Sequence, residues 1–273
     1  FHSAQCMEGV IHGDIDGDGD DDILCNHWSL VPGQGMTWYE SIDRAPWLVE
    51  HVIGTEGETH GNGLGDINGD GRTDIVTPGG WYECPPKPAE DKWVFHADYT
   101  FHLIDHPEAR SPASHPMLVY DVNGDGLPDL LIGSDGFDAS STAVIFDGPQ
   151  VTSPLPTANL QPTQGYKIRG AGHSVAPAGD VNGDGVQDQL LSGGLVGAAV
   201  VFGQRSDPET IDLSKLKPRN GYTMYGANIG GEMWSDTEVH SAGDVNGDDI
   251  PDLLTLGGGD VYDFSAGAYT IYG

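Results

Sequence analysis

Short runs of apolar residues alternate with acidic, glycine-rich segments along the whole chain. Runs such as 129–133 and 252–254 begin at an Asp and reach Gly or another turn residue within a few positions, which is typical of buried β-strands. The segment 117–120, just upstream of one acidic stretch, is also strand-like. We find no long helical period, and Gly accounts for 41 of the 273 residues, about twice the usual share. The pattern predicts an all-β fold of short strands and turns.

One nine-residue pattern occurs five times, at 14–22, 66–74, 121–129, 180–188 and 244–252. Side chains with oxygen atoms stand at positions 1, 3, 5 and 9, and the residue at position 7 adds its backbone carbonyl. Gly stands at position 6 in four copies, and Asp249 takes this place in the fifth. The candidate ligands are Asp14, Asp16, Asp18, Asp20 and Asp22; Asp66, Asn68, Asp70, Arg72 and Asp74; Asp121, Asn123, Asp125, Leu127 and Asp129; Asp180, Asn182, Asp184, Val186 and Asp188; and Asp244, Asn246, Asp248, Ile250 and Asp252.

Hard oxygen ligands at this spacing are those that Ca²⁺ prefers, six to eight of them at about 2.3–2.6 Å. An EF-hand would need a Glu at position 12 and a helix on each side, and no copy has either. The pattern therefore predicts about five calcium-filled turns, each joining two antiparallel strands. The alternative is a metal-free Asp/Gly hairpin turn, in which the stacked carboxylates would repel one another. We expect the fifth loop to bind as well, because Asp tolerates a left-handed backbone better than most residues.

The five loops recur every 52 to 64 residues, a period that predicts a β-propeller with one four-stranded antiparallel sheet per blade. We expect a single domain over 1–273, with repeats at roughly 1–54, 55–108, 109–170, 171–227 and 228–273. In the fourth repeat the strands are placed near 174–179, 189–191, 198–202 and 221–225. The third strands of the five repeats are placed at 37–40, 80–83, 143–146, 198–203 and 268–273.

The unit Gly-Asp-Val-Asn-Gly-Asp-Gly, followed by an apolar strand and a strand ending in Phe-Gly or Tyr-Gly, resembles the FG-GAP repeat of integrin α-chain propellers and their bacterial relatives. The resemblance is strongest over about 165–273, whereas the Trp-Tyr-Glu strands of about 9–135 look more like the related VCBS-type repeats. Such propellers usually have seven blades. Here either five blades close the ring, or blades without the motif are absent from this chain. The last repeat stops after its third strand, and Phe1–Gln5 could supply the missing one.

The formal charge of −31 disfavours nucleic acid and anionic membrane surfaces as partners, because both are bound through clustered Lys and Arg. No apolar run reaches the length of a membrane span, so we expect no membrane insertion. The chain starts at Phe1, and we expect a processed form or part of a longer chain or assembly. Weak calcium loops fill only at millimolar Ca²⁺, which predicts a secreted or cell-surface protein. Cys6 and Cys25 could pair there, leaving Cys84 over.

Five histidines shortly precede the acidic loops and are placed on innermost strands, which line the central channel of a propeller. They could bind a transition metal or act as acid and base. The alternative is that they only satisfy strand ends and pack against neighbouring blades, and His173 is out of phase with the others. The five are His12, His60, His115, His173 and His240.

Tryptophans could stack on sugar rings, although Trp38 and Trp81 occupy equivalent third-strand positions and are expected in the core. The segment 93–96 is placed as an outer strand. The Pro-rich insertion Pro85–Asp91 and the segment Gly226–Asp236 are candidate partner-contact loops, because loops carry function more often than strands. The remaining tryptophans are Trp28, Trp47, Trp93 and Trp234.

Three hypotheses on function follow. The first is a calcium-stabilised recognition or adhesion module for an extracellular protein or glycan. The second is a lectin with sugar sites between the blades. The third is a carbohydrate lyase or dehydratase that uses the channel histidines, an activity found among some bacterial and fungal proteins that resemble the first-half pattern. No residue is singled out as catalytic, because neither a nucleophile elbow nor a P-loop is present.

Overall fold

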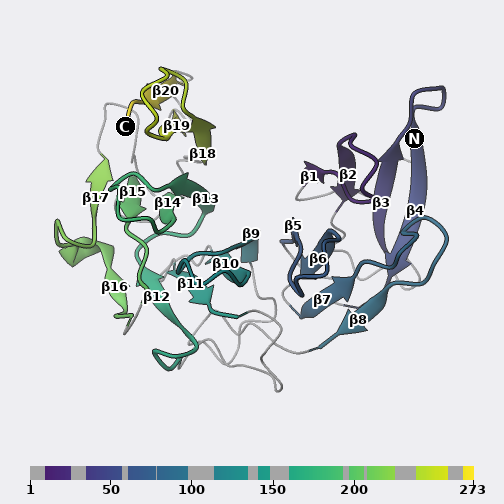
Figure 1. The fold of residues 1–273 in the computed structure, drawn as a ribbon, viewed down its shortest axis with the longest axis horizontal. Helices are drawn as coiled ribbons and strands as arrows, with labels where there is room; N and C mark the ends of the chain where they lie inside the picture. Colours follow the sequence, from purple (N-terminus) through teal and green to yellow (C-terminus); the bar gives the residue numbers. More distant parts are fainter. Residues whose placement is uncertain are drawn as a thin grey trace, which may run out of the picture. The chain divides into compact units, whose positions relative to one another are not determined.

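The computed structural model shows an all-β chain built from five separate sheets (Figure 1). It describes residues 10–25, 35–56, 61–77, 79–97, 114–134, 141–147, 160–192, 197–205, 208–224, 238–257 and 267–273. Among these residues the helical content is one 3₁₀ turn, η3 (Leu213–Lys215). No helix in the described ranges is long and apolar enough to span a membrane. The all-β prediction is confirmed.

The chain contacts divide into two compact units, one within 1–119 and 148–159, the other within 120–147 and 160–273. The first unit holds two four-stranded antiparallel sheets whose strands pair in sequence order. One sheet contains β1 (Val10–Gly13), β2 (Asp22–Cys25), β3 (Met36–Ser41) and β4 (Leu48–Gly54). The other contains β5 (Gly63–Gly65), β6 (Asp74–Thr77), β7 (Gly80–Glu83) and β8 (Val94–His96).

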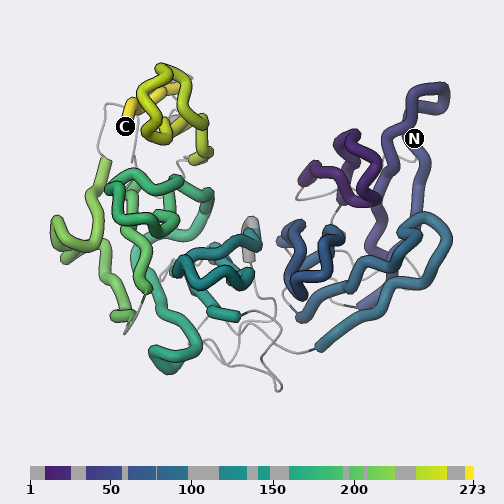
Figure 2. Tube along the Cα trace, viewed as in Figure 1, coloured from purple at the N-terminus to yellow at the C-terminus, as the bar shows by residue number. Residues whose placement is uncertain are grey.

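Three sheets follow, and the chain runs through them in sequence order (Figure 2). The third sheet is built from β9 (Ser114–Tyr120), β10 (Asp129–Ser134), β11 (Ser141–Ile145) and β12 (Gly165–Arg169). The fourth contains β13 (Ser174–Gly179), β14 (Asp188–Ser192), β15 (Ala198–Val201) and β17 (Gly221–Met224). The fifth contains β18 (Glu238–Gly243), β19 (Asp252–Gly257) and β20 (Gly267–Ile271).

These strands confirm the predicted order of the fourth repeat and the positions of the third strands in all five. The predicted outer strand at 93–96 is confirmed as β8. The last sheet has three described strands, and Phe1–Gln5 lies outside the described residues. Closure of the sheets into one propeller ring stays a prediction.

One strand leaves the simple repeat. Between β15 and β17 the chain forms β16 (Ile211–Asp212), which pairs in parallel with β12, the outer strand of the preceding sheet. Ile168 is opposite Ile211 in this pairing. A strand at the edge of a sheet presents unpaired backbone groups, and β16 covers part of this edge.

Neighbouring sheets contact each other through buried polar groups as well as apolar ones. In the first unit the Tyr82 hydroxyl donates to the Glu56 carbonyl at 2.7 Å and accepts from the Glu56 N–H at 2.8 Å. In the second unit the Tyr166 hydroxyl donates to Gln189 Oε1 at 2.9 Å. The inner strand β13 also packs against β18. Within each unit, successive sheets are thus held side by side.

The tryptophans divide into core and surface. Trp38, Trp81 and Trp93 are at most 3% exposed, so the core interpretation is confirmed for these three, whereas Trp47 is 62% exposed. Trp28 and Trp234 lie outside the described residues. Trp38 stacks on His51, its partner in the β3–β4 register, with ring centroids 4.6 Å apart.

The cysteines follow the predicted division. Cys25 is disulfide-bonded, and Cys84 is a free, buried thiol. Burial raises the pKa of Cys84 to about 12, so this thiol stays protonated at neutral pH. Cys6 lies outside the described residues.

Candidate metal-binding loops

Each acidic loop is anchored by the Asp at its ninth position, whose side chain is almost fully buried at the start of the second strand of its sheet. One carboxylate oxygen accepts the backbone N–H at position 2 of its own loop, at 2.8–3.1 Å in all five copies. The other oxygen accepts the N–H just after, or at the end of, the third strand, at 2.8–3.0 Å. These aspartates are Asp22, Asp74, Asp129, Asp188 and Asp252.

The third-strand donors occupy one equivalent position in the five repeats. The carboxylate therefore joins the loop, the second strand and the end of the third strand by the same pair of hydrogen bonds in every repeat. The donors are Ser41, Cys84, Asp147, Gly203 and Gly273.

The rest of each loop is folded by its own acidic side chains. Position 1 accepts the N–H of position 6 at 2.7–3.0 Å, and position 5 accepts the N–H of position 7 at 2.8–3.0 Å. The backbone is left-handed at positions 4 and 6 of every loop. Position 6 includes Asp249 with φ of 66°, as predicted. The Gly at position 4, present in all five copies, is a requirement that the sequence interpretation missed.

The loops bring hard oxygen atoms together. In the first loop, carboxylate oxygens of Asp14, Asp16 and Asp18 all lie within 4.8 Å of one another. In the second loop position 3 is Asn68, whose amide donates to Asp70 at 3.1 Å while its oxygen accepts the Asp70 N–H at 3.0 Å. Oxygens that accept a single hydrogen bond, such as the Asn68 amide oxygen, keep a further lone pair, since carboxylate and amide oxygens have two. The chemistry of this donor set fits Ca²⁺.

Burial is the main influence on the pKa of the anchors Asp22, Asp74, Asp129 and Asp188. It is the largest cause that raises the pKa of Asp74 and Asp188 to about 6 and that of Asp129 to about 7, while the accepted backbone N–H groups act in the opposite direction. Burial also raises the pKa of Asp22 and, with the neighbouring carboxylates, that of Asp16. Several carboxylates that share one loop without a cation thus disfavour their own ionised forms.

Arg72 and Asp147, which are outside the predicted carboxylate set, lie beside loop carboxylates. The Arg72 guanidinium, at position 7 of the second loop, contacts the Asp70 carboxylate. Asp147 stands where repeats 4 and 5 have Gly203 and Gly273, and it lies beside Asp125. Burial and Asp125 raise the pKa of Asp147. The Phe-Asp pair in place of Phe-Gly was the sequence signal for this carboxylate.

The predicted channel histidines give a mixed result. His12 lies on β1 and pairs with Asp21 at 2.8 Å, and His240 lies on β18 with Glu238 3.7 Å away. The placement of His173 on an inner strand was wrong, because it directly precedes β13. His115 lies on β9, where its side chain is not described, and His60 is outside the described residues. A shared histidine site stays a prediction.

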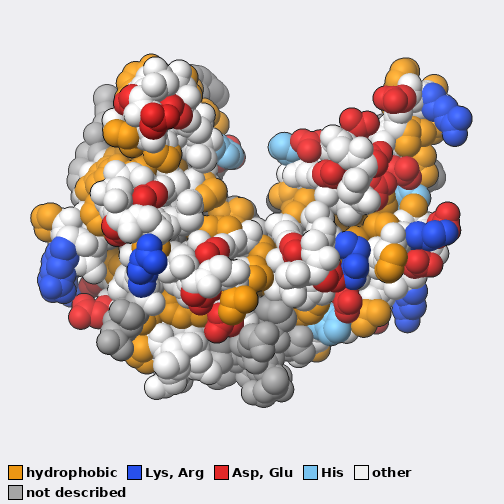
Figure 3. All heavy atoms as spheres, in the orientation of Figure 1, with side chains coloured by type: hydrophobic (Ala, Val, Ile, Leu, Met, Phe, Trp, Pro, Cys, Tyr) orange, Lys and Arg blue, Asp and Glu red, His pale blue; other side chains and the backbone are white. Residues whose placement is uncertain are grey.

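Of the two predicted contact loops, Pro85–Asp91 is a turn-rich surface segment, with Lys87 Nζ 2.9 Å from Glu90 Oε2. The segment Gly226–Asp236 lies outside the described residues. The visible face in Figure 3 carries several scattered groups of acidic side chains and fewer groups of Lys and Arg, in keeping with the net charge of −31.

Comparison with known proteins finds similarity over part of the chain. Residues 121–191, which include the third and fourth acidic loops, match the FG-GAP-like repeat. A segment of 139 residues is 33% identical to mouse integrin alpha-X and covers 45% of this chain and 12% of that protein. The predicted FG-GAP and integrin α-like resemblance is confirmed.

Two solved structures resemble the chain only weakly. The rhamnogalacturonan lyase YesW is 12% identical with a TM-score of 0.43, covering 96% of this chain and 48% of that one. The V. cholerae biofilm matrix protein Bap1 is 13% identical with a TM-score of 0.32, covering 98% of this chain and 43% of that one. The FG-GAP-like chain therefore spans less than half the length of each of these proteins.

Calcium-free protein is expected to lose stability as the pH rises from about 4 to about 7. In this window the folded anchors Asp74, Asp129 and Asp188 bind more protons than the unfolded ones, so the free energy of unfolding falls with rising pH. Ca²⁺ needs ionised ligands, so its affinity rises over the same window. We expect a higher calcium-free Tm at about pH 5 than at about pH 8, and a larger gain in Tm from calcium at pH 8. Equal gains at both pH values would contradict the assignment.

Asp249→Gly should stabilise calcium-free protein by about 0.5–1 kcal/mol, because Gly adopts the φ of 66° without steric cost. Thermal unfolding measures the gain. The matched control is Gly126→Asp in the third loop, where φ is 88°, and it should lower the Tm. A fall in Tm for Asp249→Gly would show that the Asp249 side chain has a stabilising role.

Proposed function

We propose that this chain is a secreted, calcium-stabilised β-propeller module that recognises an extracellular protein or glycan. The repeated buried anchor carries the proposal. In all five repeats one carboxylate ties the acidic loop to the end of the third strand, so any cation that orders the loop also orders the sheet. Such a device stiffens a scaffold.

In each loop the side chains at positions 1, 3, 5 and 9 and the carbonyl at position 7 would hold the ion. Bound Ca²⁺ would supply the positive charge that allows the clustered carboxylates to ionise together. The chain's own residues shape the loop. The anchors fix the loop ends, and the hydrogen bonds that positions 1 and 5 accept from loop N–H groups set the curvature of the loop. Because the ion binds the folded loops, it stabilises the fold by mass action. We expect about five ions and a ring closed by five blades, or by further blades outside this chain.

The partner class follows from charge and from the relatives. The matched segment of integrin alpha-X belongs to a protein of the integrin type, which supports an adhesion or recognition role outside the cell. The disulfide at Cys25 suits an oxidising compartment. The acidic surface opposes nucleic acid as a partner.

A lectin is the second candidate, and Trp47 favours it. This side chain is 62% exposed in the β3–β4 connection, with a left-handed φ of 70° that is rare for a bulky residue. An exposed indole can stack on a sugar ring. A lyase or dehydratase gains no support from the described histidines, since His12 and His240 each lie near an acid of their own sheet.

Arrays of glycans and of extracellular matrix proteins, probed in millimolar Ca²⁺ and again after chelation, test the proposal. We expect selective binding that chelation abolishes, together with a calcium-dependent rise in Tm. Trp47→Ala should reduce glycan binding without changing the Tm, whereas Val94→Ala, at a residue 52% exposed on another sheet, should change neither. If neither array binding nor the Tm changed with calcium, the proposed recognition module would be refuted.

A further inference from the structure

Two loops differ from the others in the charge that contacts their position-5 carboxylate. In the second loop Asp70 meets a cation, and in the third loop Asp125 meets another anion. We propose that these neighbours grade the loops as cation sites: Asp147 makes the third loop a tighter Ca²⁺ site than the fourth and fifth, and Arg72 makes the second a weaker one. The proposal deepens the proposed function and rests on calcium binding by the loops.

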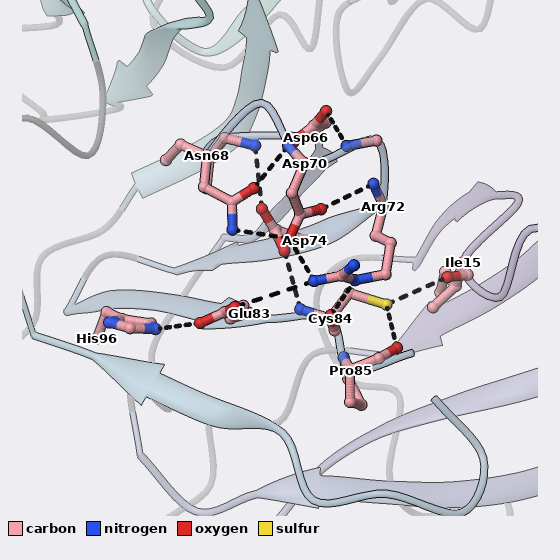
Figure 4. Close-up of polar contacts among 12 residues, drawn as sticks. Ile15, Asp66, Asn68, Asp70, Arg72, Asp74, Glu83, Cys84, Pro85 and His96 are labelled. Atoms are coloured by element: carbon pink, nitrogen blue, oxygen red, sulfur yellow. Dashed lines mark hydrogen bonds and ion pairs between the residues drawn. The ribbon is translucent and has the colours of Figure 1, made fainter. Parts of the chain in front are cut away.

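The Arg72 guanidinium contacts the Asp70 carboxylate, which a metal ion in this loop would also use (Figure 4). Its guanidinium donates to Asp70 Oδ2, which also accepts the Asn68 amide. Its Nε donates to the Cys84 carbonyl at 2.6 Å, and Nη2 lies 4.0 Å from Glu83 Oε1. The Arg72 side chain is thus held from two directions. A Ca²⁺ ion that binds Asp70 must therefore displace the Arg72 guanidinium. This competition costs affinity.

Asp147 has the opposite effect on the third loop. Its backbone N–H donates to the anchor Asp129 at 2.9 Å, which sets its Cα at the edge of the loop. Its side chain lies beside Asp125, and its Oδ1 is buried with no hydrogen-bond donor among the described residues. A buried carboxylate oxygen that faces another carboxylate is costly unless a cation or a shared proton lies between them.

At the equivalent position of the fourth and fifth repeats, a side chain would collide with the loop. A Cβ built on the equivalent Gly203 would lie 2.5 Å from Val186 Cγ1, and one built on Gly273 would lie 2.3 Å from Ile250 Cγ2. Both contacts are with position 7 of the respective loop. In the third loop the backbone of Asp147 accepts a left-handed φ of 54°, and Leu127 at position 7 is 47% exposed. The left-handed backbone of Asp147, which Gly203 and Gly273 do not share, therefore distinguishes the third repeat at this position.

Charge counts give the order of affinity. The first loop offers four carboxylates of its own, and loops four and five each offer three. The third offers a fourth through Asp147, and the second has three offset by one guanidinium. The number of charged ligands is one of the properties that tune Ca²⁺ affinity in oxygen sites. One unit charge at this range, with partial exposure, corresponds to about tenfold in the dissociation constant.

The test titrates Ca²⁺ into metal-free chain by calorimetry and follows Tm in parallel. Asp147→Asn should weaken the third-loop site about tenfold yet raise the metal-free Tm, because a like charge is removed from Asp125. Arg72→Leu, which copies Leu127, should strengthen the weakest site about tenfold and lower the metal-free Tm. Arg205→Gln is the control for the second- and third-loop sites, because Arg205 donates to carbonyls of the fourth loop, at 2.8 Å from Gly185 O and 3.3 Å from Asp184 O.

The outcomes separate the two proposals. Wild-type chain that binds no Ca²⁺ refutes the proposed function. Wild-type chain that binds Ca²⁺, with either variant leaving the affinities unchanged, overturns the graded series alone. If Arg72→Leu fails to fold, Leu127→Arg places the cation in the third loop and should weaken that site, and an unchanged affinity there overturns the inference. If Arg72 had only a structural role, Arg72→Leu would lower the Tm equally with and without calcium.

Discussion

The buried aspartate at the ninth position of each acidic loop is the interaction on which the rest of the structure depends. It accepts one N–H from its own loop and one from the end of the third strand, so the same carboxylate fixes the turn and the pairing that follows it. A neutral side chain of similar size could not accept both N–H groups as strongly, since hydrogen bonds to a charged acceptor are the stronger ones. Each of the five loops has this pair of hydrogen bonds, and each belongs to one of the five sheets.

The same carboxylates repel one another, and a bound cation would offset this repulsion. They must be ionised to accept strong hydrogen bonds, but burial and crowding raise the pKa of Asp74, Asp129 and Asp188. Arg72 offsets the crowding in one loop, and Asp147 increases it in another. Calcium would offset it in all five, which links the stability of the scaffold to the calcium level of its surroundings and suits a protein that works outside the cell.

Much of this architecture can be predicted from short stretches of sequence. The loop pattern predicts the turns because side-chain oxygens and left-handed glycines act within nine residues, and the third strands follow from their apolar runs. The pairing of β16 with β12 could not be predicted, since a two-residue strand has no pattern of its own. The contact of Arg72 with Cys84 and the approach of Asp147 to Asp125 depend on pairing between distant segments. Asp147 was nevertheless visible as the one Asp in a Phe-Gly position.

Counting the calcium retained by metal-saturated chain, by native mass spectrometry, tests the central claim most directly. The account predicts successive additions of up to five Ca²⁺ ions, one for each acidic loop in the sequence. It also predicts that Asp188→Ala removes one of them. A spectrum with no specific calcium addition, or an unchanged count in that variant, would contradict the claim that these loops are cation sites.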